Sequence, residues 1–496
     1  MIPIFDQSLR KIFAQVLEAT PENEPIYLVG GAVRDLLLNR PINDLDFVVQ
    51  DKTRQISHRV ARTLHAQSFL LDDERQTARV IYQLADGKNI LLDFVAFTGP
   101  DLKSDLFNRD FTINAMALDL NHPEQLIDPL RGAEDLKNAV LRTCSEQSIR
   151  SDPLRVLRGI RIALDYSLHI DLASKTLMKE VSSSLGAVSS ERQREELFKI
   201  LDTVQPDLGI RLMDHLDCIP AVLPELLRLK EVPASAPHVH DLWEHTLKTV
   251  NYLSKIFEVL TDSESAGKVK TWSLGFMATR LWEYRSELKE HLAKPVQAEH
   301  SRRDLLLLAA LYHETGKVDT MSAGLDQRLH YYGHANESVM IVVNRAKELC
   351  LSNREVEWLA GVVRHHMRIH QLVQSQDVLT AKAVYRFFRD ADELGVDICL
   401  LSLADTLATF EGTLKQSQWI NEIEIVYQLL NAWWHQKEAV VDPPKLLDGN
   451  DLQELFKLEP GPVFSEILES LREAQVVKKI MTREDALDFV RQFMKD

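Results

Sequence analysis

Residues 27–49, YLVGGAVRDLLLNRPINDLDFVV, predict a strand, a glycine turn, a helix and a second strand. The apolar run 27–29 ends at Gly30 and Gly31, where a backbone can turn tightly and approach a ligand. The helix-forming segment that follows carries Arg34 in its first turn. Free N–H groups at the start of a helix, with an arginine beside them, favour an anion such as a triphosphate.

Two aspartates, Asp44 and Asp46, lie two residues apart in the second strand. Side chains two apart point to the same face of a strand. Paired carboxylates beside a phosphate site favour Mg²⁺, and two such ions would activate a hydroxyl and stabilise a leaving pyrophosphate. The alternative is a solvated aspartate pair at the start of a buried strand. A later predicted strand, 90–97, adds Asp93 as a candidate third carboxylate ligand; an aspartate satisfied by the local backbone is an equal alternative.

The GGAVRD and DLDFVV segments of this stretch resemble the nucleotidyltransferase motif of class II tRNA CCA-adding enzymes and bacterial poly(A) polymerases, of the DNA polymerase beta superfamily. The resemblance implies an α+β protein with catalytic Asp44 and Asp46 and with Mg²⁺ as cofactor. It implies an N-terminal α/β nucleotidyltransferase head followed by all-α parts. The expected domains are the head at 1–127, a helical neck at 128–229, an HD-like body at 238–410 and a helical tail at 411–496.

The composition is that of an ordinary globular protein, not of a broadly basic nucleic-acid binder. The 496 residues are 45% hydrophobic and 27% charged, with a net charge of −16. That charge still allows a local basic face. The four cysteines form no CxxC pair, and the sequence shows neither a charged leader before an apolar core nor an apolar run of membrane-spanning length. We therefore expect a cytoplasmic protein without a membrane partner.

The segment 108–117, NRDFTINAMA, resembles the RRDFTINAMA motif of the same family, with Asn108 where arginine is usual. Arg109 offers a fork for phosphate oxygens, while Asp110 and Asn114 offer groups for a ribose hydroxyl or a metal. The resemblance therefore implies nucleotide binding by Arg109, Asp110 and Asn114. Considered without the resemblance, the stretch also fits a charged turn before a buried helix.

The connection that precedes this motif, residues 98–107, is short. In the family a long flexible loop usually stands here and is associated with the switch from C addition to A addition. Relatives that add only CC also have a reduced loop. The resemblance therefore favours an enzyme that stops at CC over one that completes CCA.

The run 150–161, RSDPLRVLRGIR, predicts a helix capped by Asp152. Asp152 and Arg155 lie three apart on one helical face, where an acceptor and a donor can read the edge of a base. The alternative is a capped helix with a local ion pair. The run resembles the EDxxR motif of the family, which reads CTP and ATP, with Ser151 in place of the glutamate. Arg158 and Arg161 continue the face toward phosphates, and 191–196 resembles a neck motif that buttresses this helix.

Histidines become dense after a predicted linker at 230–237. Their order resembles that of HD-superfamily phosphohydrolases, which bind one or two divalent metals on a helical bundle. The resemblance implies a second divalent-metal site whose key pair has glutamate in place of the usual aspartate. The rival interpretation is a degenerate bundle kept as an RNA-binding scaffold. The candidate ligands are His245, His313, Glu314, His334, His365 and Asp405, and the sequence leaves open whether His365 or its neighbour His366 points inward.

The tail predicts short helices around a Pro-Gly turn at 458–462, an arrangement that offers N–H groups to a phosphate backbone. It resembles the tail of class II CCA-adding enzymes. The overall expectation is a tRNA nucleotidyltransferase that adds C, A or both from CTP and ATP to the tRNA acceptor end without a template. The alternatives are a template-independent poly(A) polymerase and a non-catalytic RNA-binding relative. The residues expected to bind nucleotide are Gly30, Gly31, Arg34, Arg109, Asp110, Asn114, Asp152, Arg155, Arg158 and Arg161.

Overall fold

The computed structural model describes residues 7–21, 24–42, 44–72, 76–84, 87–297, 299–324, 329–375, 379–459 and 461–494. The chain forms two compact units, which we describe separately. The head unit comprises Met1–Val204 and Leu208–Val222, and the body unit comprises Gln205–Asp207 and Leu223–Asp496. The division falls before the predicted linker at 230–237, because residues 224–231 form the 3₁₀ helix η3 (Pro224–Glu231). The finer division into four domains stays a prediction.

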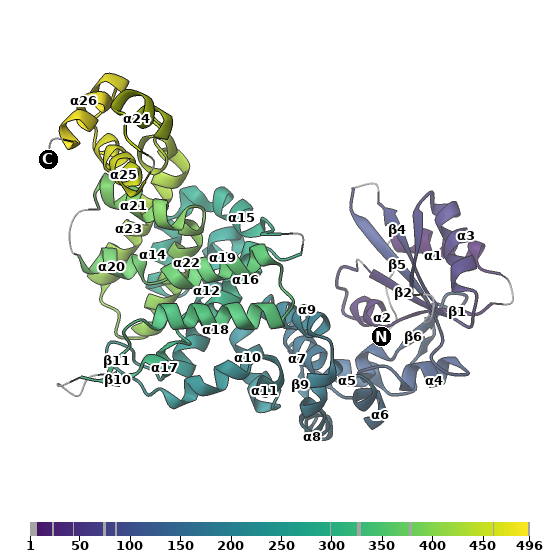
Figure 1. The fold of residues 1–496 in the computed structure, drawn as a ribbon. Coiled ribbons are helices and arrows are strands. Elements are labelled where there is room, and N and C mark those ends of the chain that lie inside the picture. Colours follow the sequence, from purple (N-terminus) through teal and green to yellow (C-terminus); the bar gives the residue numbers. More distant parts are fainter. Residues whose placement is uncertain are drawn as a thin grey trace. The chain divides into compact units, whose positions relative to one another are not determined.

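The head unit is built on one seven-stranded sheet in the order β3-β4-β5-β2-β1-β6-β7 (Figure 1). Only β2 and β5 pair in parallel; the other neighbours are antiparallel. The strands predicted at 27–29, around Asp44 and Asp46, and at 90–97 are confirmed. The strands are β1 (Ile26–Val29), β2 (Asp44–Val49), β3 (Gln67–Asp72), β4 (Thr77–Gln83), β5 (Asn89–Ala96), β6 (Ala117–Asp119) and β7 (Leu126–Ile127).

The two faces of β2 have different chemistry, because its side chains alternate. Leu45 and Phe47 are fully buried on one face, where Phe47 stacks on Phe94 at 5.2 Å between ring centroids. The helix α1 (Gln7–Ala19) covers this face and sets Phe13 edge-on against Phe47 at 6.3 Å. Asp44 and Asp46 therefore face away from the aromatic core. Helices α2 (Gly31–Leu37) and α3 (Thr53–Leu64) complete this part of the head.

Helices form most of the rest of the head unit, in agreement with the prediction for the neck. Their amphipathic faces pack together, and α7 lies against α9. The helices are α4 (Leu102–Phe107), α5 (Gly132–Lys137), α6 (Glu146–Ser151), α7 (Arg155–Asp165), α8 (Leu172–Val181), α9 (Ser190–Leu201), α10 (Pro206–His215) and α11 (Ile219–Val222), with the 3₁₀ turns η1 (Thr112–Asn114) and η2 (Ser182–Ala187) and the short strands β8 (Val140–Leu141) and β9 (His169–Ile170).

The body unit is a helical bundle around α22 (Leu394–Thr409), which is buried along almost its whole length (Figure 1). A helix that is apolar on all sides belongs at the centre of a bundle. The neighbours of α22 include α12 (Leu242–Thr261), α16 (Arg302–Tyr312) and α19 (Asn353–His365). The other elements are α13 (Ser263–Gly267), α14 (Trp272–Arg280), η4 (Trp282–Tyr284), α15 (Arg285–Ala293), α17 (Lys317–Thr320), β10 (Ser322–Ala323), β11 (Leu329–His330), α18 (His334–Glu348), α20 (Arg368–Gln374), α21 (Ala381–Ala391), α23 (Gln416–His435) and the π-helical turn η5 (Lys437–Val441).

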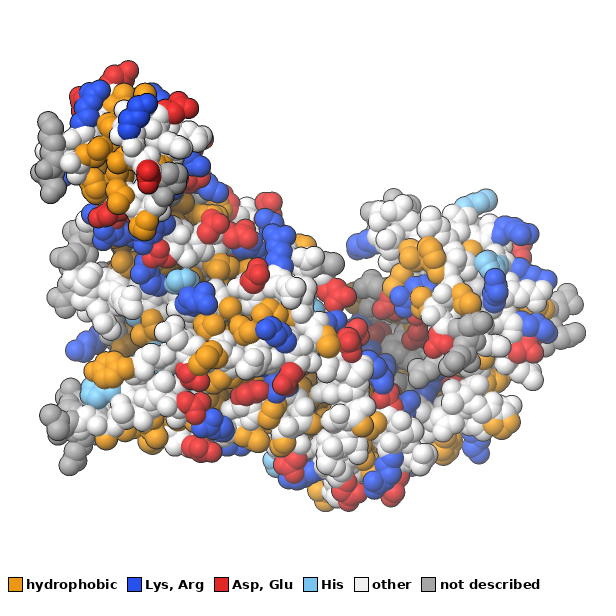
Figure 2. Space-filling model, viewed as in Figure 1, with side chains coloured by type: hydrophobic (Ala, Val, Ile, Leu, Met, Phe, Trp, Pro, Cys, Tyr) orange, Lys and Arg blue, Asp and Glu red, His pale blue; other side chains and the backbone are white. Residues whose placement is uncertain are grey.

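The tail helices α24 (Gly449–Phe456), α25 (Pro462–Val476) and α26 (Arg483–Phe493) form a small core of their own. Thr482 caps α26 with a full capping box, and Asp448 caps α24 in the same way. Pro460 of the predicted turn lies outside the described residues. On the face shown in Figure 2, hydrophobic side chains gather over the tail. Within the described residues, none of the helices combines the length and apolar character that crossing a membrane requires.

Candidate functional site

The glycine turn after β1 brings backbone close to a carboxylate and a guanidinium. Gly30 has φ of +72°, a conformation that favours glycine. A Cβ atom at Gly30 would lie 3.1 Å from Asp46 Oδ2 and 3.2 Å from Arg109 Nη1. Any larger residue would therefore push these two groups out of place. The turn, the second aspartate of β2 and the 108–117 motif meet at one point.

Three carboxylates share one face of the sheet. Asp46 and Asp93 are paired residues in the parallel ladder between β2 and β5, and Asp44 lies two positions before Asp46. The structure also gives Asp93 a partner that the sequence did not suggest. The guanidinium of Arg79 on β4 donates to both Asp93 oxygens, at 2.7 and 2.8 Å. A role for Asp93 as third metal ligand therefore requires that it share its oxygens with Arg79, and it stays a prediction.

Burial raises the pKa of Asp46 above its usual value, with Arg109 opposing the shift and the negative charge of Asp93 adding to it. Desolvation disfavours a charged carboxylate unless a cation compensates it. The pair Asp44 and Asp46 supplies the oxygen donors that Mg²⁺ prefers. The donor set therefore fits the predicted magnesium.

The raised pKa of Asp46 leads to a test of metal binding. Magnesium binds the ionised carboxylate, so protons and metal compete for Asp46. We expect nucleotide addition to fall as the pH is lowered through the raised pKa of Asp46, and this fall to move to lower pH as the Mg²⁺ concentration increases. The measurement is the initial rate between pH 5 and 8 at several Mg²⁺ concentrations. An acid limb of the profile that stays in place at every Mg²⁺ concentration would contradict the assignment of Asp46 as a ligand.

The 108–117 motif is held in a dense polar network. Asp110 Oδ1 accepts from the Phe111 backbone at 2.8 Å and from Asn114 Nδ2 at 3.0 Å, and Arg158 Nε lies 3.0 Å from Asp110 Oδ2. Burial opposes ionisation of Asp110, but Arg158 and these hydrogen bonds outweigh it, so the pKa of Asp110 lies below its usual value. Asp110 is therefore a fixed anion that orients Arg158 of α7.

Arg34 has protein partners on every side of its guanidinium. Its fork donates to both oxygens of Asp35 at 3.0 Å, its Nη1 donates to Asn114 Oδ1 at 2.8 Å, and its Nη2 also donates to the hydroxyl of Tyr166. The Tyr166 ring lies between the guanidinium carbons of Arg34 and Arg40, at 3.9 and 4.3 Å from the ring centroid. In this structure Arg34 joins α2 to the end of α7. To contact a triphosphate as predicted, its guanidinium would have to exchange at least one of these hydrogen-bond partners for a phosphate oxygen.

Two cavities of about 280 and 300 Å³ adjoin at the carboxylates. Both are lined by Gly31, Asp46, Asn114 and Arg158. The first cavity also has Arg109, Asp110 and Arg155, and the second has Arg34, Asp44 and Arg161. The structure thus brings almost all sequence-predicted nucleotide-binding residues to one concave region, with arginines and carboxylates as its polar groups.

Asp152 and Arg155, the predicted base-reading pair, do not lie together on one helix as expected. Asp152 ends α6 and does not cap α7, whose N-cap is Leu154, so the predicted cap is wrong. Asp152 instead accepts a hydrogen bond from Arg192 of α9 at 2.8 Å. Arg155 Nη1 donates to the carbonyls of Asn108 and Ser148, at 2.7 and 3.1 Å, which fixes the guanidinium at the edge of the first cavity.

Helix α9 buttresses α7, as the resemblance of 191–196 implied. Arg192 reaches Asp152, and Glu196 accepts from Arg161 Nε at 3.0 Å. Burial opposes the ionisation of Glu196, but Arg161 and Lys199 lower its pKa below the usual value. Arg161 therefore has a structural carboxylate partner on α9.

The short connection at 98–107 is ordered by its own residues. Asp101 caps α4 by accepting from the Ser104 backbone at 2.8 Å. The buried Asp105 accepts from the Thr98 backbone at 2.9 Å and from Arg109 Nε at 3.0 Å. Asn108, which replaces the usual arginine, donates to the Thr98 carbonyl at 3.1 Å. The two ends of the connection are thus tied together beside the cavity.

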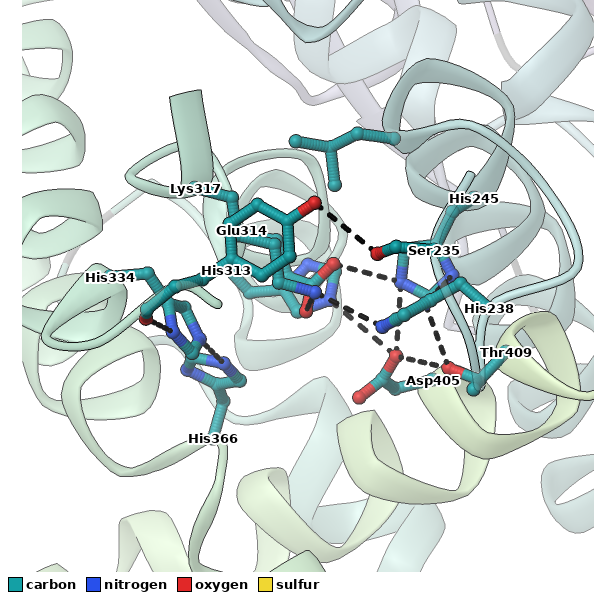
Figure 3. Close-up of polar contacts among 12 residues, drawn as sticks. Ser235, His238, His245, His313, Glu314, Lys317, His334, His366, Asp405 and Thr409 are labelled. Atoms are coloured by element: carbon teal, nitrogen blue, oxygen red, sulfur yellow. Dashed lines mark hydrogen bonds and ion pairs between the residues drawn. The ribbon is translucent and has the colours of Figure 1, made fainter. Parts of the chain in front are cut away.

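A second polar centre lies inside the body unit (Figure 3). His245 of α12 is fully buried, with its Nε2 3.3 Å from Glu314 Oε2 and 3.1 Å from Asp405 Oδ1. His313 Nε2 lies 3.8 Å from the same Asp405 oxygen. Ligand atoms about 3.3 Å apart are what a tetrahedral ion with bonds of about 2.0–2.1 Å requires. These four side chains fit a divalent metal.

The histidines of this centre are oriented as metal ligands usually are. His313, His334 and His366 each place Nδ1 within 2.6–2.9 Å of a backbone carbonyl, of Ala310, Tyr331 and Val363 respectively. Such a contact directs the Nδ1 proton to the carbonyl and leaves the Nε2 lone pair for a ligand. Nitrogen-rich sites of this kind favour transition metals over Mg²⁺.

One predicted ligand is wrong. His365 lies outside the cluster, and its neighbour His366 takes its place, 1% exposed, with Nε2 3.3 Å from His334 Nε2. Successive helical residues point about 100° apart, and the packing of α19 turns the second one inward. Burial lowers the pKa of His366 to about 3, so the ring is neutral at physiological pH.

The sequence reasoning missed two members of the centre, His370 and Lys317. His370 donates to Asp405 Oδ2 at 2.7 Å, which outweighs its burial and raises the pKa of His370 to about 9. Lys317 contacts Glu314 and His238. Two spacings held the signal: Glu314 and Lys317 are three apart, and His366 and His370 are four apart, spacings that within a helix place two side chains on one face.

Three family models match successive parts of the chain. A family model described as the poly A polymerase head domain matches residues 26–142, one described as a probable RNA and SrmB-binding site of polymerase A matches 167–229, and an HD domain model matches 242–409. The A-adding tRNA nucleotidyltransferase of Deinococcus radiodurans is 28% identical over 475 residues, which cover 95% of each chain. The CC-adding tRNA nucleotidyltransferase of Thermus thermophilus is 29% identical over 472 residues, 93% of this chain and 92% of the relative.

Solved structures share the fold. A CCA-adding enzyme in an apo form superposes with a TM-score of 0.63 at 21% identity, over 98% of this chain and 95% of the other. The CCA-adding enzyme of Thermotoga maritima, complexed with tRNA, gives a TM-score of 0.57 at 20% identity, over 99% and 96% of the two chains. The likeness spans both compact units.

Proposed function

We propose that the chain adds nucleotides from CTP, ATP or both to the 3′ end of tRNA without a nucleic-acid template, because it is similar over most of its length to tRNA nucleotidyltransferases and matches the poly A polymerase head model. The observation that carries this proposal is the meeting of Asp44, Asp46, the glycine turn and the 108–117 motif around adjoining cavities. The expected place of action is the cytoplasm. Relatives of both specificities, A-adding and CC-adding, resemble this chain to a similar degree.

The reaction joins the primer 3′ oxygen to the α-phosphorus of the nucleotide and releases pyrophosphate. Asp44 and Asp46, with Asp93 as a third candidate, would hold two Mg²⁺ ions, which supply activation of the primer hydroxyl and charge compensation at the pyrophosphate. The turn at Gly30 and Gly31 lets the triphosphate approach the backbone. Arg109 and Arg158 are aimed by Asp105 and Asp110, so their free N–H groups face the phosphates from fixed positions.

The direct test incubates the purified chain with tRNA that lacks its 3′ CCA end, one nucleoside triphosphate at a time. We expect extension with CTP, ATP or both, and none with an unrelated RNA. Long A tails on the unrelated RNA would favour the poly(A) polymerase alternative. Absence of extension with any triphosphate and any RNA would favour the non-catalytic alternative.

Arg155 is the residue proposed to read the incoming base. We expect Arg155→Ala to flatten the preference among CTP, ATP, UTP and GTP, because hydrogen bonds to a base edge are worth about 1–3 kcal/mol, roughly 5- to 150-fold. The measurement is kcat/KM for each triphosphate. The control is Arg150→Ala on the neighbouring α6, whose exposed side chain pairs with Glu180 at 2.9 Å. An unchanged order of preference with a uniform loss of rate would assign Arg155 a structural role.

We also propose that the histidine centre of the body unit holds a second divalent ion, at His245, His313, Glu314 and Asp405. The support is the spacing of their ligand atoms, their burial and the backbone contact that orients His313. Glutamate is one methylene longer than the usual aspartate, yet Glu314 still reaches His245. A centre that binds no metal would favour the scaffold interpretation.

A further inference from the structure

The histidine centre has two halves, which Glu314 separates (Figure 3). We call His245, His313, Glu314 and Asp405 the carboxylate half, and His334 with His366 the histidine pair. Nε2 of His245, Nε2 of His313 and Oε2 of Glu314 are buried without a hydrogen-bond partner among the described residues. Buried polar atoms left in this state are costly unless a ligand joins them. The carboxylate half therefore has a complete set of metal-ligand atoms directed at one point.

The histidine pair is less complete. Its two Nε2 atoms lie 3.3 Å apart, which suits a metal, but two imidazoles alone make a poor site. Among the described residues, Glu314 is the carboxylate that forms a possible ligand group with the pair. An ion at the pair would therefore need the second oxygen of Glu314, Oε1, while Oε2 faces His245.

Lys317 already occupies that second oxygen. Its ammonium contacts Glu314 Oε1 and lies 3.1 Å from His238 Nε2, and its side chain is only 8% exposed. It also lies 5.3 Å from the centre of the Tyr331 ring, a cation–π distance. The position is local in origin, because Lys317 begins α17 one turn after Glu314. A buried monovalent cation thus stands where a bridging carboxylate would otherwise serve a second metal.

We propose that the centre binds one transition-metal ion per chain, in the carboxylate half, and that Lys317 prevents a second ion from binding at His334 and His366 by holding Glu314 Oε1. This inference rests on the metal binding proposed above. It assigns Lys317 a role in metal stoichiometry and leaves the histidine pair metal-free.

The experiment counts Co²⁺ per chain by elemental analysis after loading and gel filtration. The full-length chain carries Asp44→Asn and Asp46→Asn, so that the head site does not contribute. We expect one Co²⁺ in this parent, none after Asp405→Ala, and one after His366→Ala. Lys317→Met is expected to bind two, and Lys317→Arg one. The matched control is Lys248→Met, since Lys248 is another partly buried lysine of this unit, paired with Glu411 at 3.0 Å.

Each result is decisive. Two ions in the parent, with one lost on His366→Ala, would overturn the role of Lys317 and leave metal binding intact. No ion in the parent would overturn both this inference and the metal proposed above for the histidine centre. One ion in a folded Lys317→Met chain would also overturn the role of Lys317. If thermal melting shows that Lys317→Met is unfolded, Lys317→Gln replaces it: two ions would support the role of Lys317, and one ion would overturn it.

Discussion

Asp46→Asn is expected to abolish nucleotide addition while the head unit stays folded. The variant keeps the shape of the side chain and removes one anionic metal ligand. Metal ions contribute several kcal/mol to the stabilisation of developing charge, and about 1.4 kcal/mol is tenfold in rate, so the loss is roughly 10³-fold or more. The measurement is the rate of CTP incorporation into tRNA that lacks its 3′ end. Asp44→Asn is expected to act in the same direction.

The stability of the Asp46→Asn variant should not fall with its activity. Burial raises the pKa of Asp46, which means that the ionised carboxylate is less stable in the folded chain than in the unfolded chain. Above this pKa the charge lowers the free energy of unfolding, so Asp46→Asn without metal is expected to melt at or above the temperature of the parent. The control is Asp119→Asn on β6, whose side chain accepts hydrogen bonds from the backbone and the side chain of Asn121. An active and well-folded Asp46→Asn chain would rule out the catalytic assignment.

The second large effect concerns A addition. We expect C addition to a tRNA that ends at the discriminator base, and A addition to a CC-ended tRNA slower by roughly 10²-fold, because a mismatched base edge costs about 1–3 kcal/mol. A change from CTP to ATP requires the base-reading groups to move. Arg155 donates to the Asn108 carbonyl, and Asn108 donates to the Thr98 carbonyl, so the residue proposed to read the base is anchored to the ordered connection at 98–107.

The measurement uses both tRNAs with CTP or ATP alone and follows the length of the product. CTP alone with the CC-ended tRNA serves as the control, because it shows whether the chain stops adding C once the CC end is complete. Efficient addition of A to the CC-ended tRNA would show that another segment, or the tRNA itself, drives the rearrangement, and the prediction would then be wrong.

The head was predictable because its signals are local. The alternation of β2 places Asp44 and Asp46 on one face whatever the rest of the chain does. The hydrogen bond between Arg79 and Asp93 was not predictable, because it depends on the register of β4 against β5. The partners of Arg34 come from Asn114 and Tyr166, 80 and 132 residues away, and no periodicity reports such contacts.

The histidine centre shows the same limit. The order of its ligands along the chain predicted the cluster, but the choice between His365 and His366 depends on how α19 is rotated against its neighbours. The predicted cap at Asp152 failed for a related reason. Arg192 of α9 draws that carboxylate away from the start of α7, and only tertiary structure supplies this competitor.

The closed connection at 98–107 has a consequence for how specificity changes during evolution. Its ends are held together by Asp105 and Asn108, so residues inserted between them would extend a loop whose closure is already in place. Loop-closure entropy grows slowly, by about 0.6 kcal/mol for each doubling of length. A long insertion here costs little folding stability, so an ancestor could gain or lose a mobile loop without rebuilding the sheet, and the repertoire of added nucleotides could diverge while the carboxylates stay fixed.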